Sequence, residues 1–155
     1  MAKLLTSLPL EKAASMIDCA LQTGAKQGMS PLTVIVLDAG GHMVAMKRSD
    51  GSGILRVEVA QGKAYGALGM GIPSSVLGAN LADRPSFLNA LAVASSGRFI
   101  PVAGGVLICD GDDLVIGSVG ISGDASDKDE YCAIVAIQSV GYGSIPAEPA
   151  KGLPG

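Results

Sequence analysis

The chain has 155 residues, the usual size of one domain and enough to bury a substantial core. Apolar residues make up 48% of it and charged residues only 16%, against roughly 25% in an average domain, so we expect a homo-oligomer that hides apolar helix surface. The net charge is −3, Lys and Arg are scattered and Trp is absent, which excludes the basic and aromatic pattern of nucleic-acid-binding proteins.

Three further features predict a cytoplasmic protein with no membrane segment. The apolar runs are far shorter than the ~20 residues that span a bilayer. The first 16 residues lack a long apolar core before a cleavage site, so we interpret them as mature sequence. Cys19, Cys109 and Cys132 are odd in number and widely spaced, which is typical of reduced, buried cysteines and not of a disulfide framework or a zinc site.

The first half of the chain predicts a helix, a hairpin and further helices. Apolar residues recur at three- and four-residue steps through residues 10–21, which follow Pro9 and predict the first helix. Residues 32–37 are apolar and β-branched, residues 38–41 are turn-forming, and residues 42–47 return as a second strand.

Three helical segments follow this hairpin. Residues 55–68 are predicted as a helix rich in Ala and Gly, and shorter helices are predicted at residues 73–82 and 86–94. Asp83-Arg84-Pro85 separates the two short helices, because a residue before proline disfavours the α conformation.

The second half predicts another hairpin and a last helix. Residues 105–110 and 114–122 form the hairpin, and a helix begins near Ser126, where Asp129 three residues on resembles a capping box. Hairpins in place of βαβ units predict an antiparallel sheet covered by helices, an α+β fold. The chain becomes rich in Pro and Gly from Gly143, so we predict one domain over residues 1–145 and a flexible tail over residues 146–155.

The glycines of the second hairpin do not form a nucleotide-binding loop. Gly117, Gly120 and Gly123 are evenly spaced and do not match the GxGxxG pattern. Glycine within a strand more often allows a helix or another backbone to approach closely, and that is our interpretation.

Five residues are candidate ligand-binding groups. His42 is the single histidine and titrates near neutral pH when unperturbed, so it is either a surface residue or a ligand and proton carrier. Lys63, among small residues, is a candidate anion binder, and Glu58 lies five residues before it, off its helix face. Arg84 and Arg98 are candidates to pair with carboxylates. The acidic residues 124–130 are explained mainly by the preference of carboxylates for a helix N-terminus.

Five segments in order resemble the GlcG/HbpS haem-binding protein family, which includes the C-terminal domain of some cobalamin adenosyltransferases: VLDAGGHMVAMKRSDG, VEVAQGKAYGA, RPSFLNAL, PVAGGVLI and IGSVGISGDASDKDEYCA. The resemblance spans about residues 33–141. It implies a profilin-like fold with a five-stranded antiparallel sheet between helices, assembly into tetramers to octamers, and binding of haem or iron. The secreted haem-binding branch has two acidic residues one helical turn apart; Glu58 matches the first, and Gln61 stands at the second.

Three functions are compatible with these observations. The first is a haem- or tetrapyrrole-binding protein, with His42 as the candidate axial and metal ligand. The second is an enzyme or accessory protein of a catabolic pathway, in which Lys63 and Arg84 hold an organic acid while His42 or a carboxylate of residues 124–130 moves a proton. The third is an assembly module without a ligand.

Overall fold

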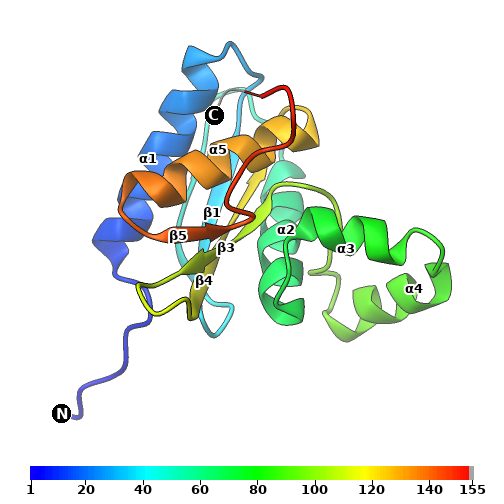
Figure 1. Ribbon diagram of the computed structural model, residues 1–155, viewed down its shortest axis with the longest axis horizontal. Coiled ribbons are helices and arrows are strands. Elements are labelled where there is room, and N and C mark those ends of the chain that lie inside the picture. Colours follow the sequence, from blue (N-terminus) through cyan, green and yellow to red (C-terminus); the bar gives the residue numbers. More distant parts are fainter. Residues whose placement is uncertain (154–155) are drawn as a thin grey trace.

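The computed structural model describes residues 1–153, which form five helices and one five-stranded sheet (Figure 1). The elements in chain order are α1 (Leu10–Lys26), β1 (Thr33–Asp38), β2 (Met43–Arg48), α2 (Arg56–Met70), α3 (Ser74–Leu81), α4 (Pro85–Ala94), β3 (Gly105–Cys109), β4 (Val115–Ser122), α5 (Ser126–Ser139) and β5 (Gly143–Ile145). All strand pairs are antiparallel, in the order β2-β1-β4-β3-β5. The predicted α+β fold with a five-stranded antiparallel sheet flanked by helices is confirmed.

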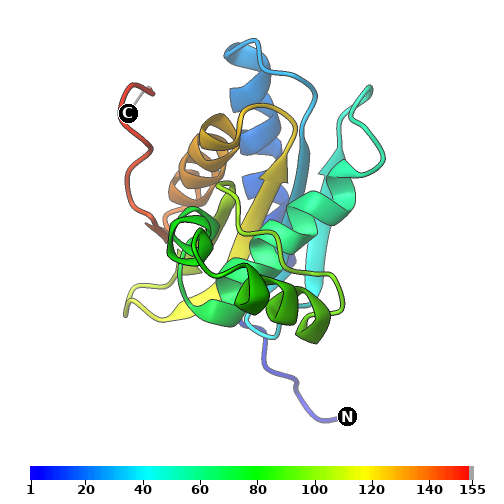
Figure 2. The same ribbon diagram turned by 90° about the vertical axis from the view of Figure 1, so that its right-hand side faces the viewer.

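Helices cover both faces of the sheet. α1 and α5 lie on one face, where they enclose the main core with alternate strand residues such as Val34 and Val36. α2 packs on the other face, against Ile35 and Leu37. α3 and α4 stand beyond α2, on the side away from α1 and α5 (Figures 1 and 2). Each helix of the described part is too short or too polar to cross a bilayer.

The side of β4 that faces α2 is built from small residues. Ser118, Gly120 and Ser122 point toward α2, and the Ser118 hydroxyl donates a hydrogen bond to the Ala64 carbonyl at 3.0 Å. A Cβ atom at Gly120 would overlap the carbonyl oxygen of Ala60, so glycine is required there. The prediction that the hairpin glycines admit a helix or another backbone is confirmed: Gly120 admits α2, while a Cβ atom at Gly117 or Gly123 would overlap the carbonyl oxygen of Leu37 or Pro31. α2 therefore packs almost backbone to backbone on the sheet at Gly120.

The predicted capping box at the start of the last helix is wrong. Ala125 is the N-cap of α5 and makes no side-chain cap hydrogen bond, which leaves Ser126 as the first helical residue. The carboxylate of Asp129 turns into the protein, where it meets Lys63. Asp129 therefore joins a buried tertiary pair and also accepts a hydrogen bond from the Asp124 N–H ahead of the helix, in place of the expected capping box with Ser126.

The segment after α5 adds a fifth strand to the sheet. Gly143–Ile145, where the chain becomes rich in Pro and Gly, forms β5, which pairs with the outer edge of β3 and satisfies backbone groups that would otherwise be exposed. Beyond β5, the Gln138 side chain donates a hydrogen bond to the Ala147 carbonyl at 2.8 Å. Residues 154–155 of the predicted tail lie outside the described residues.

Candidate functional site

Lys63 is the deepest of the predicted site residues. Its side chain is 3% exposed, and its ammonium group donates hydrogen bonds of 2.9 Å to the Asp129 carboxylate and 2.9 Å to the Ile121 carbonyl. These contacts join α2 to α5 and β4. The anion that Lys63 contacts is therefore a carboxylate of its own chain.

Asp129 is held from two sides. One carboxylate oxygen accepts the hydrogen bond from Lys63, and the other accepts one from the Asp124 N–H at 3.1 Å. Burial raises the pKa of Asp129 above its ordinary value, and the charge and hydrogen bond of Lys63 oppose that rise. Gly104 leaves room for the pair, since a Cβ atom there would lie 2.9 Å from the Lys63 nitrogen.

Glu130 is a second buried carboxyl group beside this pair. It is 6% exposed, and among residues 1–153 its Oε2 is buried with no hydrogen-bond partner. Burial raises the pKa of Glu130, and the Ser75 hydroxyl and the Gly104 N–H offset part of the rise. The fold therefore favours the protonated form of this side chain more than water does.

Tyr65 lies on a flank of α2, where it packs in part against the cluster of Ile35 and Leu37 and borders two hollows. One, of about 240 Å³, lies between α2 and α4, and the other, of about 130 Å³, lies between α2 and the β1–β2 turn. Both are lined by Tyr65 and Gly69. A Cβ atom at Gly69 would meet no described atom within 4 Å, so the helix surface is bare where the hollows meet. The remaining lining of the larger hollow is mostly apolar: Gly66, Met70, Leu91, Ala94, Ser95 and Phe99.

Arg98 lies directly over Tyr65. Its guanidinium carbon is 4.1 Å from the centre of the tyrosine ring, and Nη2 donates a hydrogen bond of 3.4 Å to the phenol oxygen. Nε of Arg98 also donates to the Ser95 carbonyl at 3.1 Å, which ties the guanidinium to the end of α4. Arg98 thus stands at the rim of the larger hollow.

His42 lies on the β1–β2 turn, next to the smaller hollow. The turn is held by Asp38, whose Oδ1 accepts hydrogen bonds from the N–H groups of Gly40 at 2.9 Å and His42 at 3.0 Å. The His42 side chain is 83% exposed, and its Nδ1 lies 3.5 Å from Asp38 Oδ1. Gly41 adopts a φ of +79° and lies against Tyr65, since a Cβ atom there would be 3.0 Å from the tyrosine ring.

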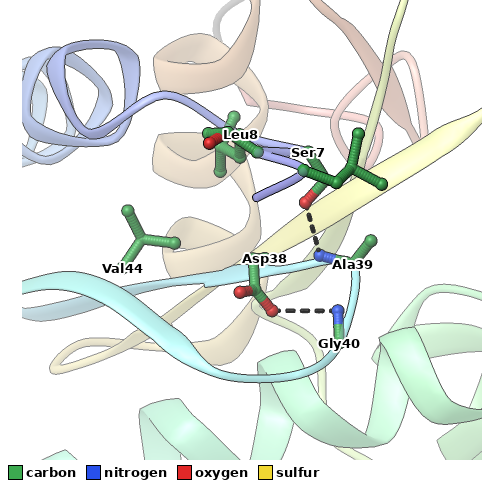
Figure 3. Close-up of a pocket in the computed structure, with 8 residues that line it drawn as sticks. Ser7, Leu8, Asp38, Ala39, Gly40 and Val44 are labelled. Atoms are coloured by element: carbon green, nitrogen blue, oxygen red, sulfur yellow. Dashed lines mark hydrogen bonds between the residues drawn. The ribbon is translucent and has the colours of Figure 1, made fainter. Parts of the chain in front are cut away.

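A third hollow, of about 300 Å³, lies on the other side of this turn (Figure 3). It is bounded by the N-terminal arm, where the Ser7 hydroxyl accepts a hydrogen bond from the Ala39 N–H at 3.0 Å. Asp38 is the titratable side chain of its lining, and one oxygen of Asp38 already holds the turn. With Thr6, Ser7 and Asp38 in its lining, this hollow is more polar than the one between α2 and α4 and suits a flat apolar ring less well.

Glu58 and Arg84 occupy different places. Glu58 is exposed and precedes Tyr65 by seven residues, or two helical turns, which puts both on one face of α2. Arg84 precedes α4 and stacks on Phe87 at 4.5 Å, whereas the larger hollow is lined by the other end of α4. The structure thus brings Arg98 onto Tyr65, leaves the His42 side chain exposed beside Asp38, and separates both from Lys63 and Arg84.

The described residues contain no group of three His, Cys, Asp or Glu side chains placed to hold a metal ion. Cys109 and Cys132 are buried, and burial raises the pKa of the Cys132 thiol to about 12. The assignment of His42 as a metal ligand stays a prediction.

The sequence did not single out Tyr65 or Gly69, and it offered Asp129 only as a capping residue and as one of the carboxylates of residues 124–130. The segment GKAYGA did contain a signal for Tyr65, because a single aromatic side chain among Ala and Gly projects from an otherwise bare helix surface. Asp129 gave no such signal, since it lies 66 residues from Lys63 and acquires its partner through tertiary packing.

Replacing Asp129 should reveal how strongly the fold depends on the buried pair. Asp129→Asn leaves the Lys63 ammonium buried without a counter-charge, so we expect a loss of about 3–5 kcal/mol in the free energy of unfolding, measured with urea. The double variant Lys63→Met/Asp129→Asn should lose less than Asp129→Asn alone. Asp18→Asn is the matched control, because its pair with Lys47 is half exposed and should contribute at most about 1 kcal/mol. Equal losses for Asp129→Asn and Asp18→Asn would contradict this role.

Glu130 should make stability depend on pH. Because its folded pKa lies above the ordinary 4.5, its contribution to stability falls as the pH rises from about 4.5 through the folded pKa. The unfolding free energy of Glu130→Gln relative to the parent should therefore rise across that window, by at most about 1.4 kcal/mol per pH unit, and then level off. Urea unfolding from about pH 4 to 8 measures this difference, with the exposed Glu11→Gln as control. A difference that is constant or falls with pH would rule the explanation out.

The family model described as haem degrading protein HbpS-like matches residues 8–138. Comparison with curated protein sequences gives no match. Among solved structures, a double mutant of HbpS from Streptomyces reticuli is 25% identical with a TM-score of 0.75, and the match covers 91% of this chain and 91% of that chain.

Two further structures share the fold. PduOC in complex with haem is 24% identical with a TM-score of 0.78, covering 90% of this chain and 98% of that chain. Protein ORFY of Klebsiella pneumoniae is 23% identical with a TM-score of 0.76, covering 90% and 94%. Because the family model spans most of the chain, the resemblance read from the sequence is confirmed, and the chain belongs to the HbpS-like family.

Proposed function

We propose that this protein binds haem or a related tetrapyrrole on the outer face of α2, in the two hollows that meet at Gly69. The family description refers to haem, and PduOC, which has a similar fold, was solved as its haem complex. The observation that carries the proposal is the mostly apolar hollow beside Tyr65, with potential iron ligands around it. When bound, haem would supply an iron centre whose axial ligand comes from His, Cys, Met or Tyr.

The lining of the hollow suits a flat apolar ring with carboxylate substituents. Gly69 and Ala94 leave the facing surfaces of α2 and α4 bare, while Leu91 and Phe99 offer apolar contacts. Arg98 stands at the rim, where its guanidinium group could pair with a propionate. Binding would therefore combine burial of the ring with an ion pair at its edge.

A second copy of the chain would complete this site. A hollow of about 240 Å³ is smaller than the roughly 300–1,000 Å³ of most ligand sites, so one chain would cover a tetrapyrrole only in part. Every residue of the neighbouring α4 is exposed or partly exposed, including Val93 at 80%. We therefore propose a homo-oligomer, from tetramer to octamer, in which α4 is covered. The three free cysteines support a reducing compartment, the cytoplasm.

An enzyme or accessory protein acting on an organic acid is less well supported. It requires Lys63 and Arg84 to hold one carboxylate, but the Lys63 ammonium is engaged by Asp129 beneath α2 and Arg84 stacks on Phe87 at the far end of α4. An assembly module without a ligand would fill its concave surface with its own side chains, whereas the hollows beside Tyr65 remain open.

Titration with hemin tests the binding site. The parent should show a saturable Soret shift, and Gly69→Leu should weaken binding at least about tenfold, because Gly69 lines both hollows and the new side chain extends from a position where a Cβ atom meets no described atom. Gly111→Leu is the matched control, since a Cβ atom at that turn also meets no described atom within 4 Å. The absence of a saturable shift in the parent would overturn the proposed function, and equal binding by Gly69→Leu would exclude this site.

Native mass spectrometry tests the oligomer. The parent should contain four to eight subunits, as the family resemblance implies, and Val93→Glu should reduce that number because it places a charge on the apolar surface of α4. Leu114→Glu is the control, because Leu114 is 64% exposed in the β3–β4 turn. A monomeric parent would contradict assembly through α4.

A further inference from the structure

Tyr65 is the potential iron ligand with the most access to the two hollows. It lines both of them, whereas Met70, also on α2, lines one, and His42, on the β1–β2 turn, lines neither. Its ring is half-buried and projects from the middle of α2, whose inner face is fixed to the sheet. The side chain is therefore presented from a rigid element and borders both hollows.

Arg98 restrains the orientation of this side chain. The guanidinium group covers one face of the ring and donates to the phenol oxygen, and it is itself anchored on the Ser95 carbonyl. A cation beside the oxygen stabilises the negative charge that remains when a phenol becomes a metal ligand. Tyr65 on α2 is thus placed as a metal ligand, and Arg98, in the segment after α4, holds it in position.

The other potential axial groups are less well placed. His42 stands on a turn with its side chain 83% exposed, and its ring lies toward Asp38. Cys109 and Cys132 are buried within the fold, and the 42% exposed Met70 lies at the end of α2. Among the described residues, Tyr65 alone combines partial burial, a fixed orientation and access to both hollows.

We propose that Tyr65 is the axial ligand of ferric haem in this protein and that Arg98 is its positioning residue. The assignment rests on the proposed haem binding in the hollows of α2. The phenol oxygen forms the bond to iron and releases its proton to solvent, so the iron keeps its oxidation state. His42, the ligand expected from the sequence, then lies outside the iron's first coordination shell.

Tyr65→Phe tests ligation separately from packing, because it removes the oxygen and keeps the ring. Hemin-loaded parent protein should show phenolate vibrations in its resonance Raman spectrum and a phenolate-to-iron charge-transfer band, and Tyr65→Phe should lose both. The affinity of Tyr65→Phe for hemin should fall at least about tenfold, while its affinity for metal-free protoporphyrin IX should stay within about twofold of the parent. Tyr142→Phe is the matched control: Tyr142 is also half-buried, with the Lys12 ammonium 5.8 Å from its ring centre, but lies outside the two hollows.

The outcomes separate the ligand assignment from haem binding itself. If Tyr65→Phe keeps the parent's hemin spectrum, the assignment is wrong and haem binding stands. The same holds if the parent binds hemin without phenolate bands and His42→Ala changes that spectrum, because His42 would then be the iron ligand. Equal losses of hemin and protoporphyrin IX affinity would assign Tyr65 a packing role only. If the parent binds neither compound, the proposed function fails and the assignment fails with it.

Arg98→Met should keep the phenolate bands but shift the charge-transfer band, since the cation beside the oxygen is removed.

Discussion

Direct packing of α2 on the backbone of β3 and β4 determines where every other residue of the candidate site lies. Gly105 and Gly120 have no side chain on this face, and a Cβ atom at either would overlap a carbonyl oxygen of α2. The helix is consequently held close to the sheet along its whole inner side. Its outer side is then free to carry Tyr65 and Gly69 at a fixed height above the sheet, facing α4 and the β1–β2 turn.

The Lys63–Asp129 pair acts at the same junction and fixes the rotation of α2 about its axis. A buried ion pair is not by itself strong evidence of stability, because desolvation of both charges opposes their attraction. Removing one member is costly, however, so any rotation that parts Lys63 from Asp129 is disfavoured. With Lys63 directed inward, Tyr65 is directed outward, since two residues along an α-helix differ by about 200°. The buried charges and the outer hollows are thus two consequences of one helix orientation.

The sequence was informative about features that depend on local chemistry and much less so about features that depend on distant partners. Strand alternation, turn glycines and helix periodicity predicted four of the strands and all five helices, and the ordered segments identified the family. Strand β5 was missed because Gly143–Ile145 gains its structure only by pairing with β3. The sequence also could not show that Lys63 faces Asp129, or that Arg98 covers Tyr65, because both contacts join segments that are far apart in the chain.

A crystal structure of the protein loaded with hemin tests the central claim, that the outer face of α2 is the ligand site. We predict a tetrapyrrole across α2 at Gly69, with its iron bonded to the Tyr65 oxygen and Arg98 still beside that oxygen. Haem bound against α1 and α5, or in the hollow beside Ser7 and Asp38, with Tyr65 unbonded, would contradict it.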